Sequence, residues 1–153
     1  MNLEQKVEEL SSFIPKQSAS AAQVSNQSVG WHIDHCFKVI AQVEGALSQT
    51  DPNKFKKPGF QLWKAIVMTT GYIPRGKVKA PKVVRPEVEE FTEEALRNQE
   101  KAARKLIDGA SGVPAKAYFE HPIFGHIARD EAQRFLAVHT HHHLKIIKDI
   151  LKG

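Results

Sequence analysis

The sequence predicts an all-α fold, namely a four-helix bundle with one short extra helix and long crossover loops. Apolar residues recur at helical spacing in four segments. Breaks that contain proline, glycine or asparagine separate these segments, and no strand-like alternation extends beyond a few residues. The 153 residues, of which 41% are hydrophobic and 25% charged, suit a single domain over residues 1–153.

The first helix is expected over residues 2–14, where Pro15 ends it. Its apolar face consists of Leu3, Val7, Leu10 and Ile14. A polar connector over 16–27 follows, and a second helix is expected over 28–49 with Ser28 as its N-cap. The apolar arc of this helix holds Val29, Ile33, Cys36, Val39, Ile40, Val43 and Leu47.

Two histidines lie on the second helix. His32 falls within the apolar arc and His35 toward its edge, so helical geometry alone favours His32 as the inward residue. Asp34 lies about 100° around the helix from His35 and is expected to face solvent. Cys36 has two interpretations, a fourth metal ligand or a small buried apolar residue, and the second is the commoner role.

Shorter elements connect the second helix to the last one. A short helix is expected over 60–70, then a crossover loop over 72–88 that contains three prolines, then a helix over 92–109 with Leu106 among its inward residues. The stretch HPIFGHIARDE is expected to be a loop before the final helix. Three large aromatic residues fit either pocket walls or, as is usual, the core: Trp31, Trp63 and Tyr72.

The final helix, expected over 129–151, carries the strongest functional signal. Its apolar stripe consists of Ala132, Phe135, Leu136, Ile146, Ile147 and Ile150. His139 falls in the middle of this stripe, and His143 lies one turn further along the same face. Buried imidazoles need partners for their nitrogens, which a shared divalent metal or hydrogen-bonding groups on other helices would supply. Helical sequence continues to Gly153, which argues against a purification tag.

Three short motifs stand out, namely QSVGWHIDHCFKVI in the second helix, HTHHHL in the last helix and HPIFG at 121–125. Together they resemble the DinB/YfiT-like superfamily of metalloenzymes, in a branch without an assigned activity. The resemblance implies that His35, rather than His32, joins His139 and His143 as the metal ligands. The chain departs from the pattern at Gln27, where many members have tryptophan. Two additional histidines, His32 and His142, compete for the ligand positions.

Three neutral histidines would leave a coordination position open, as catalytic metal sites do. Such a set favours a transition metal, with Zn²⁺ or Ni²⁺ expected, and the ion would activate water or bind a thiolate. The resemblance implies a metal-dependent hydrolase or a thiol-dependent transferase. His121 and His126, in the loop before the metal helix, are the candidate catalytic or substrate-contact groups. The alternative for His121 is that it caps the His-Pro turn.

Charge and composition limit the partners. The net charge of +5 is concentrated in two loops, around 54–57 and 75–85, but no DNA-reading motif accompanies it, so no nucleic-acid partner is expected. No apolar run is long enough to span a membrane, and no membrane partner is expected. One cysteine favours a reducing compartment, with the cytoplasm as the default. The expected partner is a small molecule such as a thiol, and dimers are common for such bundles. A non-catalytic metal-binding or stress-response protein is the alternative function.

Overall fold

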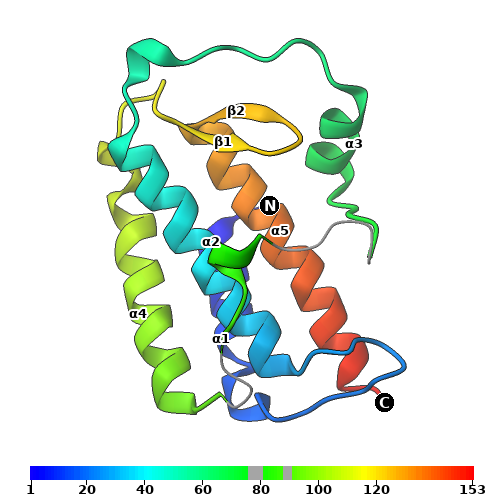
Figure 1. Ribbon diagram of the computed structural model, residues 1–153. Coiled ribbons are helices and arrows are strands. Elements are labelled where there is room, and N and C mark those ends of the chain that lie inside the picture. Colours follow the sequence, from blue (N-terminus) through cyan, green and yellow to red (C-terminus); the bar gives the residue numbers. More distant parts are fainter. Residues whose placement is uncertain (76–80, 88–90) are drawn as a thin grey trace.

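The computed structural model describes residues 1–75, 81–87 and 91–153. Its helices and strands are α1 (Leu3–Ser11), α2 (Val29–Gln49), α3 (Leu62–Thr70), α4 (Glu93–Gly109), β1 (Tyr118–His121), β2 (Gly125–Ala128) and α5 (Arg129–Ile150) (Figure 1). The helical class predicted from the sequence is confirmed, apart from the small two-stranded sheet. Parts of the predicted crossover loop, residues 76–80 and 88, lie outside the described residues.

Four helices pack around a shared apolar core. α2 contacts α4 and α5, and α1 contacts the same two helices from the other side (Figure 1). The face predicted for the first helix is buried, although α1 ends at Ser11 and Ile14 lies in a short 3₁₀ turn after it. Ser28 caps α2 as predicted, because its hydroxyl accepts a hydrogen bond from the Trp31 N–H at 3.2 Å. The cap fixes where the histidine-bearing helix begins.

The segment expected to be a loop before the last helix contains a β-hairpin instead. β1 and β2 pair antiparallel, with Phe119 opposite Ile127, and both of these side chains are buried. Gly125 adopts φ +67°, a left-handed conformation that favours glycine, where the chain turns back. Each strand has only four residues, too few for a clear period-two pattern. Because α5 starts directly after β2, the hairpin fixes the start of the second histidine helix.

Several side chains lie on the opposite side from the one predicted. Asp34 is only 4% exposed, because α4 covers this face of α2 and the Gln99 amide donates to its carboxylate at 2.6 Å. Leu106 is exposed on α4. The core interpretation is also wrong for Trp63 and Tyr72, which are 46% and 57% exposed.

Within the described residues, no helix combines the length and apolar character needed to cross a membrane.

Candidate metal centre

The structure brings His35, His139 and His143 together between α2 and α5. One ring nitrogen from each lies within 4.8 Å of those of the other two. The ring centroids are 4.7 Å apart for His139 and His143, 4.8 Å for His35 and His143, and 5.1 Å for His35 and His139. The four-residue spacing on α5 places two rings one turn apart, and α2 supplies the third from across the interface.

Burial keeps these imidazoles neutral. His35 and His143 are 4% and 8% exposed, whereas His139 is partly exposed. Desolvation lowers the pKa of His35, although the Val84 carbonyl and the Asp34 carboxylate partly oppose this shift. Desolvation and the neighbouring histidines hold the pKa values of His139 and His143 well below their usual range. At neutral pH each ring therefore carries one N–H and one nitrogen with a free lone pair, which is the state that a metal requires.

A backbone carbonyl fixes the tautomer of His35. The Nδ1–H of His35 donates to the carbonyl oxygen of Val84 at 2.7 Å, and a carbonyl can only accept. The proton is therefore on Nδ1, and Nε2 carries the free lone pair. Val84 is buried in the short 3₁₀ turn Lys82–Val84, which crosses α2 beside this histidine. Such a hydrogen bond from the second nitrogen commonly orients metal-binding histidines.

A chain of side chains supports His143 in the same way. Its Nδ1 lies 2.9 Å from Nδ1 of His32, whose Nε2 lies 3.1 Å from the Ser25 hydroxyl. If His143 directs the lone pair of Nε2 toward a metal, then its Nδ1–H donates to His32 and the Nε2–H of His32 donates to Ser25. The Ser25 oxygen already accepts the Gln27 N–H at 3.1 Å, which is consistent with this direction. His32 is therefore a hydrogen-bond partner of the candidate ligand His143 and does not belong to the three-histidine group.

Aromatic rings surround the histidines. Trp31 stacks on His35, with centroids 5.0 Å apart and planes inclined by 20°, and it contacts His32 edge-on. Phe135 lies 6.0 Å from His139, measured between centroids. Trp31 is thus a wall of this site, one of the two roles that the sequence left open for it. His139 is the one residue of the group that is partly exposed, so solvent comes nearest to the group at this residue.

His142 and Cys36, the other possible ligands, lie apart from the three-histidine group. The ring of His142 stands edge-on to His143, with a pKa lowered to about 4, chiefly by burial. Cys36 is fully buried, and desolvation raises the pKa of its thiol. A neutral thiol is a poor metal ligand, so these surroundings suit a small core residue.

The two candidate catalytic histidines both lie in the hairpin. Nδ1 of His121 accepts the N–H groups of Ile123 and Phe124 at 3.1 and 3.2 Å, which is the turn-capping role considered from the sequence. Burial lowers its pKa to about 4. The His121 ring also stands edge-on to Phe135, the residue beside His139. His126 accepts the Lys56 N–H at 3.0 Å and stacks on Tyr118. A catalytic role for either histidine stays a prediction.

The donor set fits a divalent transition metal. A tetrahedral zinc ion with Zn–N bonds of about 2.0–2.1 Å spaces its ligand nitrogens by about 3.4 Å, so small ring rotations would bring these three within bonding distance. Imidazole donors favour Zn²⁺, Ni²⁺, Cu²⁺ or Fe²⁺ over Mg²⁺ and Ca²⁺. Among the described residues, only these three histidines form a group with the spacing of metal ligands, and no carboxylate belongs to it. The ligands would therefore leave the full positive charge of the ion uncompensated.

Comparisons with protein families, with curated proteins and with solved structures returned no match. The arrangement of the three histidines therefore carries the functional argument.

Proposed function

We propose that this protein is a divalent-metal-dependent enzyme of the DinB-like type, with His35, His139 and His143 as the ligands of Zn²⁺ or Ni²⁺. The observation that carries the proposal is a group of three neutral imidazoles, contributed by two helices and held within 4.8 Å. Packing of α1, α2, α4 and α5 is compatible with the four-helix bundle of that superfamily. The three sequence motifs support the family assignment independently of the geometry.

Because all three ligands are neutral, they influence which further ligand a bound ion would take at its open coordination position. A bound divalent ion supplies Lewis acidity at an open coordination position and favours an anionic partner there, such as hydroxide or a thiolate. The chain contributes three imidazole nitrogens, a wall formed by Trp31 and an approach past the partly exposed His139. Because the group contains no carboxylate, the substrate or a hairpin histidine would have to supply further proton transfer. A small molecule, with a thiol as the leading candidate, is the substrate class that we infer.

Metal analysis of untagged protein tests the ligand assignment. We expect one transition-metal ion per wild-type chain and a sharp loss of metal in His139→Ala and His143→Ala. His141→Ala is the matched control, because His141 lies on the same helix but outside the three-histidine group. Equal metal loss in all three variants would remove the basis of the assignment.

Activity assays then separate an enzyme from a metal-binding protein without catalysis. The metal-loaded protein is tested with a thiol plus an electrophile and with a panel of esters and amides. Turnover that disappears in His139→Ala supports the enzyme. Stoichiometric metal without turnover on either panel favours the non-catalytic alternative.

A further inference from the structure

A basic and apolar surface at the hairpin end of the molecule has no role in the metal centre. It combines the loop before α3, the start of α3 and the hairpin turn (Figure 1). We call it the end surface and define it as Lys54, Lys56, Lys57, Phe60, Leu62, Trp63 and Ile123. All seven residues are exposed.

Hydrogen bonds and packing join the parts of the end surface. The backbone N–H of Lys56 donates to Nδ1 of His126 at 3.0 Å. The side-chain amide of Gln61 donates to the backbone carbonyl of Phe124 at 3.4 Å. Pro58 packs beside Gly125, so the loop runs along the hairpin turn. The exposed side chains therefore project from a segment that is fixed to the hairpin at both ends.

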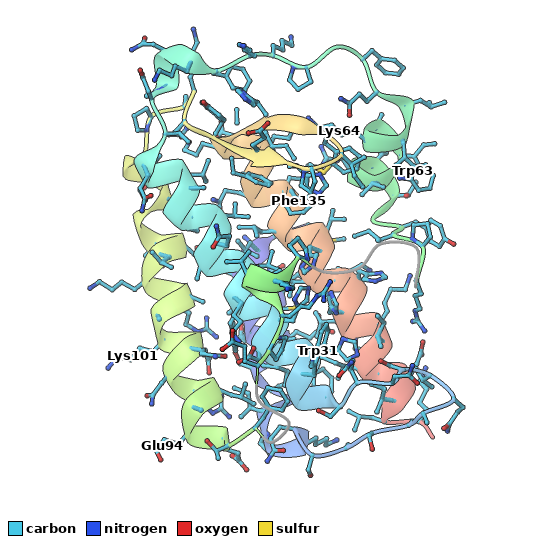
Figure 2. All side chains as sticks on the ribbon, viewed as in Figure 1. Trp31, Trp63, Lys64, Glu94, Lys101 and Phe135 are labelled. Carbon is cyan, nitrogen blue, oxygen red and sulfur yellow. The ribbon has the colours of Figure 1, made fainter. Side chains whose placement is uncertain are left out.

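The apolar exposure is large for so short a segment. Phe60 is 87% exposed, Leu62 65% and Trp63 46%, and Ile123 on the adjoining turn is 51% exposed. α3 instead buries Val67 and Met68, and Lys64 turns to Glu131 of α5 in a 2.8 Å ion pair, with Trp63 left outside (Figure 2). Adjacent exposed apolar side chains of this size are typical of an interaction surface.

We propose that the end surface docks on an anionic lipid membrane. Phe60, Leu62, Trp63 and Ile123 would enter the headgroup region, where tryptophan and other amphipathic or apolar side chains are stabilised. Lys54, Lys56 and Lys57 would contact anionic headgroups, since none of the three has an ion-pair partner among the described residues. The protein would lie on the membrane without crossing it, so the proposal departs from the sequence-based expectation of no membrane partner.

Two other occupants fit this surface less well. A symmetric contact with a second copy would place like-charged lysines near one another, and seven residues are far fewer than the roughly 20–30 per partner in a stable interface. Single-stranded nucleic acid could stack bases on Phe60 and Trp63, but it would leave the exposed aliphatic side chains of Leu62 and Ile123 without apolar partners. Aliphatic side chains mixed with aromatic ones and lysines match a lipid surface best.

Vesicle flotation with metal-free protein tests this proposal apart from the proposed enzyme function. We expect binding to vesicles of equal parts phosphatidylcholine and phosphatidylglycerol, weak binding to phosphatidylcholine alone, and release by high salt. Replacing Lys54, Lys56 and Lys57 together by glutamine should weaken binding on the order of a hundredfold. The variant Phe60→Ser with Leu62→Ser should weaken it at least about tenfold.

A charge-matched control replaces three exposed lysines elsewhere, Lys16, Lys101 and Lys105, by glutamine. It should retain most of the binding, and circular dichroism checks that every variant is folded. Equal loss in the control and the end-surface variant, or no binding to the mixed vesicles, would overturn the proposal. Dimerisation or single-stranded DNA binding that depends on Phe60 in place of vesicle binding would overturn it too.

Discussion

Replacing His32 tests whether this residue orients a metal ligand or is a ligand itself. In His32→Phe, the Nδ1 of buried His143 loses its partner at 2.9 Å, while the aromatic volume beside Trp31 is largely kept. An unpartnered buried donor costs about 1–3 kcal/mol, and loss of a residue that orients a ligand typically lowers metal affinity about 10–100-fold. Burial lowers the pKa of His32 to about 3, so the wild-type residue is neutral at pH 7 and suited to accept this hydrogen bond.

The assay is a competition titration of Zn²⁺ against a chromophoric chelator, with stoichiometry measured separately. His32→Phe should bind one ion with an affinity reduced about 10–100-fold. His32→Asn, whose side-chain oxygen can accept a hydrogen bond, should recover part of the loss, and Ser25→Ala should show a smaller defect. Unfolding of the metal-free variants gives their folding controls. The reasoning is wrong if His32→Phe binds as tightly as wild type, or if it loses metal as completely as His139→Ala.

Three further predictions concern stability and the accessible ligand. The pKa of His121, about 4 in the fold against 6.5 in the unfolded chain, makes the unfolded state bind more protons between these pH values. As the pH falls from 7 to 4, the free energy of unfolding of wild type should therefore drop by about 2 kcal/mol more than that of His121→Asn, allowing for the partial exposure of the ring. Denaturant unfolding at several pH values measures this difference. The prediction is wrong if the free energies of the two proteins change in parallel with pH. Zn²⁺ at a hundred times its dissociation constant should stabilise wild type by about 2.7 kcal/mol and leave His143→Ala nearly unchanged, as a thermal melt with and without chelator would measure. Free imidazole should restore metal binding to His139→Gly, at the accessible position, but not to His143→Gly; equal rescue would contradict the difference in their exposure.

The parts of the site that lie within one helix could be predicted from the sequence. The i, i+4 spacing of His139 and His143 on an apolar stripe is a local property of α5, and the Ser28 cap is a local property of α2. Which of the two α2 histidines, His32 or His35, joins His139 and His143 does not depend on α2 alone. Both face α5, and the position of α5 along α2 decides that His35 joins the group while His32 contacts His143 from behind.

The hairpin and the buried Asp34 show a different limit of prediction from the sequence. Strands of four residues carry too short a pattern, and the pairing of Phe119 with Ile127 depends on a turn that Gly125 permits. Asp34 was expected in water because helical geometry gives only an angle around the axis. Whether that angle faces solvent or α4, where the Gln99 side chain donates to the carboxylate, depends on the packing of the whole chain, whereas the ion pair of Asp34 with Lys38 lies within α2.

The three histidines are held unequally, and this bears on how a site of this kind can work. His35 is fixed by the Val84 carbonyl and His143 by His32, and both rings are buried. His139 is partly exposed and has no hydrogen-bond partner among the described residues. With two oriented nitrogens and one adjustable nitrogen, an entering ion would reach its preferred coordination geometry through adjustment of His139. In the proposed metal centre, His35 and His143 would therefore hold the ion in a set position, and His139 would be the ligand that is able to adjust.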